Sequence, residues 1–142
     1  MGGNYKANST PEQWSAKLER GRKYKQGQRA ARASATTPET LREQVASLYR
    51  GGERTRWLTR EMFMELWDEH VKTHGFRCAM SGQPFDMSVK ATRPSVDQII
   101  PSAGYWPGNV RFVTFIVNET RSNMSDANFL AMCQGVVKHL KP

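Results

Sequence analysis

The sequence predicts an α+β fold, in which a short two-stranded hairpin and a following helix are surrounded by α-helices and preceded by a basic N-terminal arm. Three observations lead to this prediction. Helix starts with a proline recur in the first part of the chain, turns and short extended runs begin at Arg77, and positive charge is concentrated near the N-terminus. At 142 residues the chain is long enough for one domain with a core and an appendage. We place the arm in residues 1–35 and the domain in residues 36–142.

The arm carries most of the positive charge. The net charge is +8 and the pI is near 9.9, which indicates a polyanionic partner, either nucleic acid or an anionic membrane face. Residues 1–34 hold eight lysines and arginines against two glutamates. A helix start at Thr10–Pro11 is followed by Gly21, Gly27 and few apolar residues, so we expect the arm to be helical at most in part.

We favour phosphate contact for this arm over the alternative of a solvated or disordered tail that only aids solubility. The cations that we expect to contact nucleic acid are Arg20, Arg22, Lys23, Lys25, Arg29 and Arg32.

Two further helices are expected before Arg77. Thr37 and Thr59 are N-cap residues for them, and Gly51–Gly52 and Gly75 are their stop signals. Apolar residues recur at helical spacing in both, which predicts that one face of each packs on the core. These residues are Leu41, Val45 and Leu48 in the first helix and Phe63, Leu66, Trp67 and Val71 in the second.

The histidines and cysteines do not predict a zinc site. His70 and His74 are four apart and share a helix face, but a metalloprotease would need HExxH and the sequence is HVKTH. We interpret them as ordinary surface or helix-end histidines. Cys78 and Cys133 are too few for a four-cysteine site, and buried reduced thiols are favoured over a disulfide.

The hairpin is expected between Pro94 and residue 115. Pro94 imposes an extended conformation on the residue before it, SVDQII follows as a strand, and Pro101 ends that strand. A turn-rich loop, SAGYWPG, leads to the second strand NVRFVTF and then to a helix opening at IVNETRSN. We interpret Tyr105 and Trp106 as packing the loop, with base stacking as the alternative role.

A last amphipathic helix, capped by Ser125, is expected to close the core. Mean hydropathy is -0.67 and no stretch is apolar enough to span a membrane. The N-terminus also lacks the apolar segment of a secretory signal. We therefore expect an intracellular protein that is neither secreted nor bound to a membrane.

Three polar residues lie where packing alone would not require them. Asp97, near the end of the first strand, offers the anionic oxygen that Mg²⁺ prefers, and Asn118 on the following helix offers a neutral oxygen. Asn109 stands at the junction of loop and strand, where an amide ties the loop backbone by hydrogen bonds. Each also has an ordinary interpretation as a strand-end, turn or helix residue. Together, at this spacing, they favour an ion site that acts on a phosphodiester.

These segments carry a resemblance. RCAMSGQPF and RPSVDQIIPSAGYWPGNVRFVTFIVNETRSN, covering about residues 77–125, resemble the HNH (His-Me finger, ββα-metal) nucleases. The resemblance is to phage and prophage members that read roughly C-x-x-[TS]-G-x-P-F, P-S-[LIV]-D-R-I-D, G-Y-x-x-x-N-V-R and a later Asn. It implies that Asp97 and Asn118 are the metal ligands and that Asn109 is the middle Asn of the motif.

The resemblance also implies an activity. The expected function is a metal-dependent DNA endonuclease or nickase with one Mg²⁺, or Mn²⁺, acting on DNA rather than RNA inside a bacterial or phage-infected cell. Cys78 stands where many relatives begin a zinc-binding CxxC pair, but the partner cysteine is absent, so no structural zinc is expected. Phosphates near the site would be held by Arg93, Arg111 and Arg121.

Gln98 departs from the best-known members, in which the residue after the metal-binding Asp is the His general base. A glutamine orients a water but does not accept its proton near neutral pH. The chain then either uses a base from elsewhere, with His74 as the candidate, or keeps binding without catalysis, or carries a deliberate replacement. The alternatives to an enzyme are an inactive HNH-fold nucleic-acid-binding protein and a component of a nucleoprotein assembly.

Overall fold

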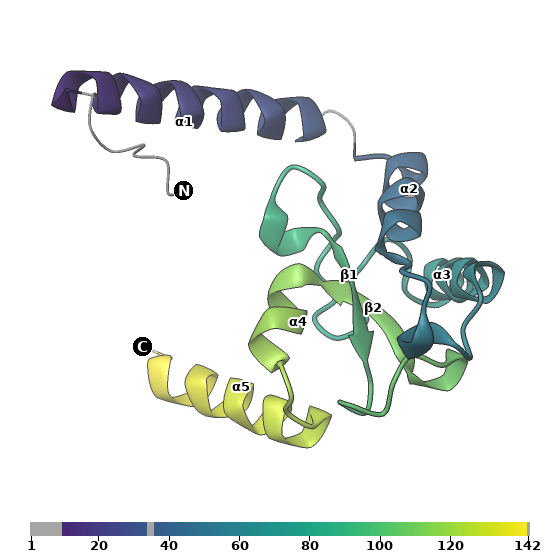
Figure 1. Cartoon of the computed structure of the whole chain (residues 1–142). Coiled ribbons are helices and arrows are strands. Elements are labelled where there is room, and N and C mark those ends of the chain that lie inside the picture. The colour runs from purple at the N-terminus through teal and green to yellow at the C-terminus, as the bar shows by residue number, and fades with distance from the viewer. Residues whose placement is uncertain (1–9, 34–35, 142) are drawn as a thin grey trace, which may run out of the picture.

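The computed structural model describes residues 10–33 and 36–141 and, for residues 28–33, the backbone path alone. Within these ranges the chain forms five α-helices and one two-stranded antiparallel sheet (Figure 1). The predicted α+β class is therefore confirmed. The elements are α1 (Pro11–Ala33), α2 (Pro38–Leu48), α3 (Arg60–His74), β1 (Pro94–Gln98), β2 (Val110–Thr114), α4 (Phe115–Arg121) and α5 (Asp126–Leu140).

Helix α1 begins with the capping box that the sequence predicts. The Thr10 N–H donates to Oε1 of Gln13 at 2.9 Å, and Oγ1 of Thr10 accepts from the Gln13 N–H at 3.3 Å. The helix then continues through Gly21 and Gly27, further than we expected. Its lysines, arginines, glutamines and alanines are strong helix formers, and together they offset the roughly 1 kcal/mol that each glycine costs. Figure 1 shows α1 standing apart from the sheet.

The predicted caps of α2 and α3 are confirmed. Oγ1 of Thr37 accepts from the Thr40 N–H at 3.2 Å, and Oγ1 of Thr59 accepts from the Met62 N–H at 3.2 Å. Helix α3 ends at Gly75, whose φ of 67° suits a residue without a Cβ. The caps and the glycine set the bounds of α2 and α3. Both helices then contact the sheet, α2 at β1 and α3 at β2.

The sheet lies at the centre of the core. Strands β1 and β2 pair in antiparallel register, with Val96 opposite Phe112 and Asp97 opposite Arg111. The ring of Phe112 meets Phe63 and Trp67 of α3 edge-on, at centroid distances of 5.5 and 5.2 Å. The buried apolar residues are Leu41, Val45, Leu58, Phe63, Trp67, Cys78, Phe85, Val110, Phe112 and Val113.

Helix α4 follows β2 without a loop and packs against both strands, as expected for the hairpin-and-helix unit (Figure 1). Helix α5 has the predicted Ser125 cap, whose Oγ accepts from the Asn128 N–H at 3.2 Å. The expectation that α5 closes the core is wrong, because none of its residues is buried. Leu130, Val136 and Leu140 are all more than half exposed. Among the described helices, none combines the length and apolar character needed to cross a bilayer.

Candidate functional site

A polar hollow of about 200 Å³ opens where the end of β1 meets α4 and the loop between the strands. Asp97, Gln98 and Asn118, which the sequence singles out, all line it. With Arg121, which also lines it, the chain brings four of the predicted site residues to one place. The hollow is also lined by Arg54, Val96, Pro101, Ser102, Tyr105, Arg121, Ser122 and Asn123.

The carboxylate of Asp97 is held by two arginines. Its Oδ1 accepts from Nη1 of Arg121 at 2.9 Å, and its Oδ2 accepts from Nε of Arg111 at 2.8 Å. Asp97 and Arg121 are only 3% and 1% exposed, so water and salt weaken the attraction between these two side chains much less than they would at the surface. Both arginines also pair with Asp126 at the start of α5. These four residues, Asp97, Arg111, Arg121 and Asp126, form the Asp97 cluster, which has no net charge.

The arginines of the cluster are already committed to partners inside the protein. Arg121 also donates to the carbonyl oxygens of Gln98 and Ile99, at 2.9 and 2.6 Å. Arg111 binds Asp126 through two parallel hydrogen bonds of 2.7 and 2.6 Å. These bonds hold the pKa of the Asp126 carboxyl below its ordinary value and raise the pKa of the Arg111 guanidinium. The cluster thus fixes α4 and the start of α5 to the sheet.

Asn118 reaches the hollow from α4. Its Nδ2 donates to Oγ of Ser95 at 2.8 Å and to the carbonyl oxygen of Val96 at 3.0 Å, so α4 is tied to β1 through this amide. No described residue donates a hydrogen bond to its Oδ1. Of the side-chain oxygens of the two predicted metal ligands, Asp97 and Asn118, it is the one that accepts no hydrogen bond from a described residue, so it remains available to a ligand.

Asn109 is fully buried and makes the loop-tying contacts expected of an amide at this junction. Its Oδ1 accepts from the Ile100 N–H at 2.7 Å, and its Nδ2 donates to the carbonyl oxygens of Ile100 and Gly104 at 3.1 and 2.8 Å. Gln98 adds a longer contact, because its Oε1 accepts from the Gly104 N–H at 3.4 Å. These two amides hold the loop in place beside the hollow.

The histidines lie elsewhere. Neither His70 nor His74 lines the hollow; both are on α3, with ring centroids 4.9 Å apart. His70 is buried against Trp67, and its Nε2 is 2.8 Å from the carbonyl oxygen of Arg77. Burial lowers the pKa of His70, against the opposing effect of that hydrogen bond. His70 therefore serves the core rather than the surface role that we expected.

Both cysteines are free thiols, but only Cys78 is buried as favoured from the sequence, and Cys133 is half-buried. In the part of the chain that the structure describes, no three of His, Cys, Asp and Glu gather as a metal site.

The residues of the hollow do not fit a divalent ion as they are arranged. Asp97 is its one carboxylate, and both oxygens of that carboxylate already accept hydrogen bonds from guanidinium groups. An ion bound there would lie beside two fixed positive charges, which oppose it. The position of the last acidic residue in the quoted pattern P-S-[LIV]-D-R-I-D is Ile100 in this chain, so it supplies no second carboxylate.

The cations expected to hold phosphate are spread over the molecule. Nε of Arg93 donates to the carbonyl oxygen of Met87 at 3.0 Å. Arg20, Arg22, Lys23 and Lys25 are carried by α1, and none of them lines the hollow. The side chains of Arg29 and Arg32 lie outside the described residues.

Arg54 is the site residue that the sequence did not reveal. It lies in a short 3₁₀ turn, Glu53–Thr55, and lines the hollow with an exposed side chain. No ion pair joins it to any described residue, so its charge remains available to an outside anion. Arg54 precedes the hairpin by about forty residues, and no local motif marks it, because only the packing of α2 and α3 on the sheet brings it there.

Comparison with known proteins gives no match, whether the chain is set against family models, curated proteins or solved structures. The resemblance to HNH nucleases therefore depends on the short motifs in residues 77–125.

Proposed function

We propose that this chain is a nucleic-acid-binding protein built on an HNH-like ββα unit, in which Asp97 organises arginines instead of holding a metal ion. The observation that supports this most is that both carboxylate oxygens of Asp97 accept hydrogen bonds from Arg111 and Arg121. Gln98 adds to it, since its amide has no basic nitrogen for the water activation that hydrolysis requires. The unit would present its polar hollow to a phosphate backbone. It lacks a histidine base at Gln98 and a carboxylate that is free to bind a metal ion, because Asp97 is bound by two arginines.

Binding would come from cations that have no ion-pair partner among the described residues or only an exposed one. Arg54 faces the hollow, and Arg20, Arg22, Lys23 and Lys25 extend along α1. The one ion pair that these cations make with described residues, between Lys23 and Glu19, has both side chains more than 60% exposed and is worth little. Phosphate contacts by such side chains release counterions from the nucleic acid, which makes affinity fall with added salt. The resemblance favours DNA as the partner.

The test is a titration of labelled duplex DNA, followed by fluorescence anisotropy, with EDTA, Mg²⁺ or Mn²⁺ present in turn. We expect binding to persist in EDTA and to gain nothing from Mg²⁺ or Mn²⁺, and the affinity to fall steeply between about 50 and 200 mM salt. Arg54→Ala should weaken binding. Arg42→Ala is the matched control, because Arg42 is paired with Asp68, does not line the hollow and does not belong to α1. Binding that requires the metal, or no binding at low salt, would contradict the proposal.

A metal-dependent endonuclease or nickase is the second candidate. The observation that favours it is Oδ1 of Asn118, which no described residue satisfies and which belongs to a residue lining the same hollow as Asp97. This candidate requires Asp97 to release at least one arginine before an ion binds.

A plasmid-nicking assay separates the two candidates. Under the binding proposal, neither the chain with Gln98 nor Gln98→His cleaves in Mg²⁺ or Mn²⁺. Under the second candidate, restoring a histidine base should raise cleavage by roughly 10²- to 10⁴-fold, and Asn118→Ala should abolish it.

A further inference from the structure

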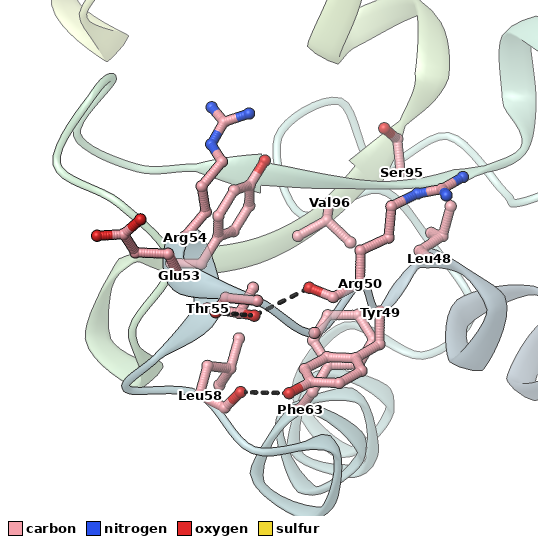
Figure 2. Close-up of a pocket in the computed structure, with 13 residues that line it drawn as sticks. Leu48, Tyr49, Arg50, Glu53, Arg54, Thr55, Leu58, Phe63, Ser95 and Val96 are labelled. Carbon is pink, nitrogen blue, oxygen red and sulfur yellow. Dashed lines mark hydrogen bonds between the residues drawn. The ribbon is translucent and has the colours of Figure 1, made fainter.

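A larger and more apolar hollow adjoins the polar one. It measures about 500 Å³ and lies between the end of α2, the turn at residues 50–55 and strand β1 (Figure 2). Leu58 and Phe63, both buried, contribute to it, together with Tyr49 and Val96. This size and character are those of pockets that enclose a small organic group.

The two hollows are neighbours, because Arg54, Val96 and Tyr105 line both. A ligand that spans them would meet the guanidinium of Arg54, which has no ion-pair partner among the described residues. In the larger hollow it would meet apolar and aromatic side chains, together with the charged side chains of Arg50 and Glu53. The hollow therefore suits a ligand with a negative end joined to a flat, largely apolar group.

The rim of the apolar hollow is held in shape by hydrogen bonds. Oγ1 of Thr55 donates to the carbonyl oxygens of Arg50 and Gly52, at 2.9 and 3.3 Å, and the Tyr49 hydroxyl donates to the carbonyl oxygen of Leu58 at 2.8 Å. Figure 2 shows these contacts closing the turn below the Arg54 side chain. Gly52 has a φ of 138°, a conformation that residues with a Cβ rarely adopt. A rim fixed in advance lowers the entropy that a ligand loses on binding.

We propose that the apolar hollow takes an unpaired nucleic-acid base whose own phosphate lies in the polar hollow beside Arg54. A base provides a flat face for the tyrosine rings, and its nucleotide supplies the anion. The base must be single-stranded or turned out of a duplex, because the hollow cannot receive a base that remains stacked and paired. This inference rests on the proposed nucleic-acid binding and specifies the form of strand that the site prefers.

The experiment compares three ligands with the full chain: a thymidine strand of about ten nucleotides, a strand of the same length made of abasic sites, and a duplex of the same length. The two single strands have the same backbone charge, so they differ in bases alone. We expect the thymidine strand to bind roughly 5- to 100-fold more tightly than the abasic strand. This comparison requires no variant and so does not depend on the folding of a mutant.

Variants of the loop then locate the base. Tyr105→Ala should bring the thymidine strand close to the abasic one, and Tyr105→Phe should keep the preference because the ring remains. Trp106→Ala is the matched control, since it removes the neighbouring aromatic residue, which lines neither hollow, and should keep the preference.

Each outcome decides the inference. Equal affinity for the thymidine and abasic strands would overturn it while leaving phosphate binding, and so the proposed function, intact. A preference that survives in Tyr105→Ala but is lost in Trp106→Ala would place the base elsewhere and would also overturn it. Failure of all three ligands to bind at low salt would overturn the inference and the proposed function together.

Discussion

At the scale of single residues, the guanidinium of Arg121 joins three segments of the chain. It contacts Asp97 of β1, Asp126 of α5 and the carbonyl oxygens of Gln98 and Ile99. Because the side chains of Arg121 and Asp97 are almost fully buried, removing Arg121 leaves Oδ1 of Asp97 charged, shielded from solvent and without its partner, while Arg111 still binds Oδ2.

Arg121→Ala should therefore lower the free energy of unfolding by about 3–5 kcal/mol, measured by urea denaturation followed by circular dichroism. Arg20→Ala, on the exposed face of α1, is the control and should change stability by less than about 0.5 kcal/mol. Similar small effects for both variants would mean that the Asp97 cluster does not form as described.

His70 gives the stability a dependence on pH. Its pKa is lowered by burial from an ordinary value of 6.5, so the folded state binds fewer protons than the unfolded state as the pH falls below that value. Stability should thus decrease from about pH 6.5 downward and level off once the pH is below the lowered pKa. Urea denaturation across this range should show the decrease in the natural chain and a smaller one in His70→Phe. His74→Ala, which removes an exposed histidine, should leave most of the decrease in place.

At the scale of elements, helix α5 is amphipathic in sequence but has no buried residue. Leu140 is 71% exposed, whereas Leu41 of α2 is 2% exposed. Leu140→Ala should change the free energy of unfolding by less than about 0.5 kcal/mol, and Leu41→Ala should lower it by about 2–5 kcal/mol. Chemical denaturation of the two variants provides the measurement, and a large loss in Leu140→Ala would show that α5 is covered in solution.

Elements whose signals are local could be predicted from the sequence. The caps at Thr37, Thr59 and Ser125 depend on residues three positions apart, and the loop contacts of Asn109 depend on a side chain reaching its own neighbourhood. The burial of α5 could not be predicted, because an apolar stripe has the same spacing whether or not another element covers it.

The contacts of the site arginines could be predicted from the sequence only in part. Pairing of Asp97 with Arg111 follows from strand register. The contact of Asp97 with Arg121 depends on the angle at which α4 crosses the sheet, and the place of Arg54 depends on the packing of α2 and α3. Neither contact is encoded in a local sequence pattern, so sequence reasoning could not anticipate that two arginines bind Asp97.

At the scale of the whole molecule, positive charge lies on α1, which stands apart from the domain (Figure 1). If α1 binds the phosphate backbone, replacing five of its cations, Lys17, Arg20, Arg22, Lys23 and Lys25, by glutamine should reduce the slope of log affinity against log salt. The reduction should be about 0.9 for each phosphate that the variant no longer neutralises.

Anisotropy titrations with duplex DNA at several salt concentrations measure this slope. Replacing Arg42 and Lys72, which are paired with Asp68 and Glu69, is the control and should leave the slope unchanged. An unaltered slope in the α1 variant would show that the helix does not touch the nucleic acid.

The contacts of Asn109 also bear on how the loop between the strands opens. The backbone N–H groups of Ile99 and Ile100 donate to the carbonyl oxygen and the Oδ1 of Asn109, at 3.0 and 2.7 Å, although the side chains of both isoleucines are exposed. Amide protons held in this way exchange with solvent only when the holding residue itself moves, and Asn109 is fully buried at the start of β2. Ile99 and Ile100 should therefore exchange as slowly as the strands, so that the loop and the sheet open as one cooperative unit.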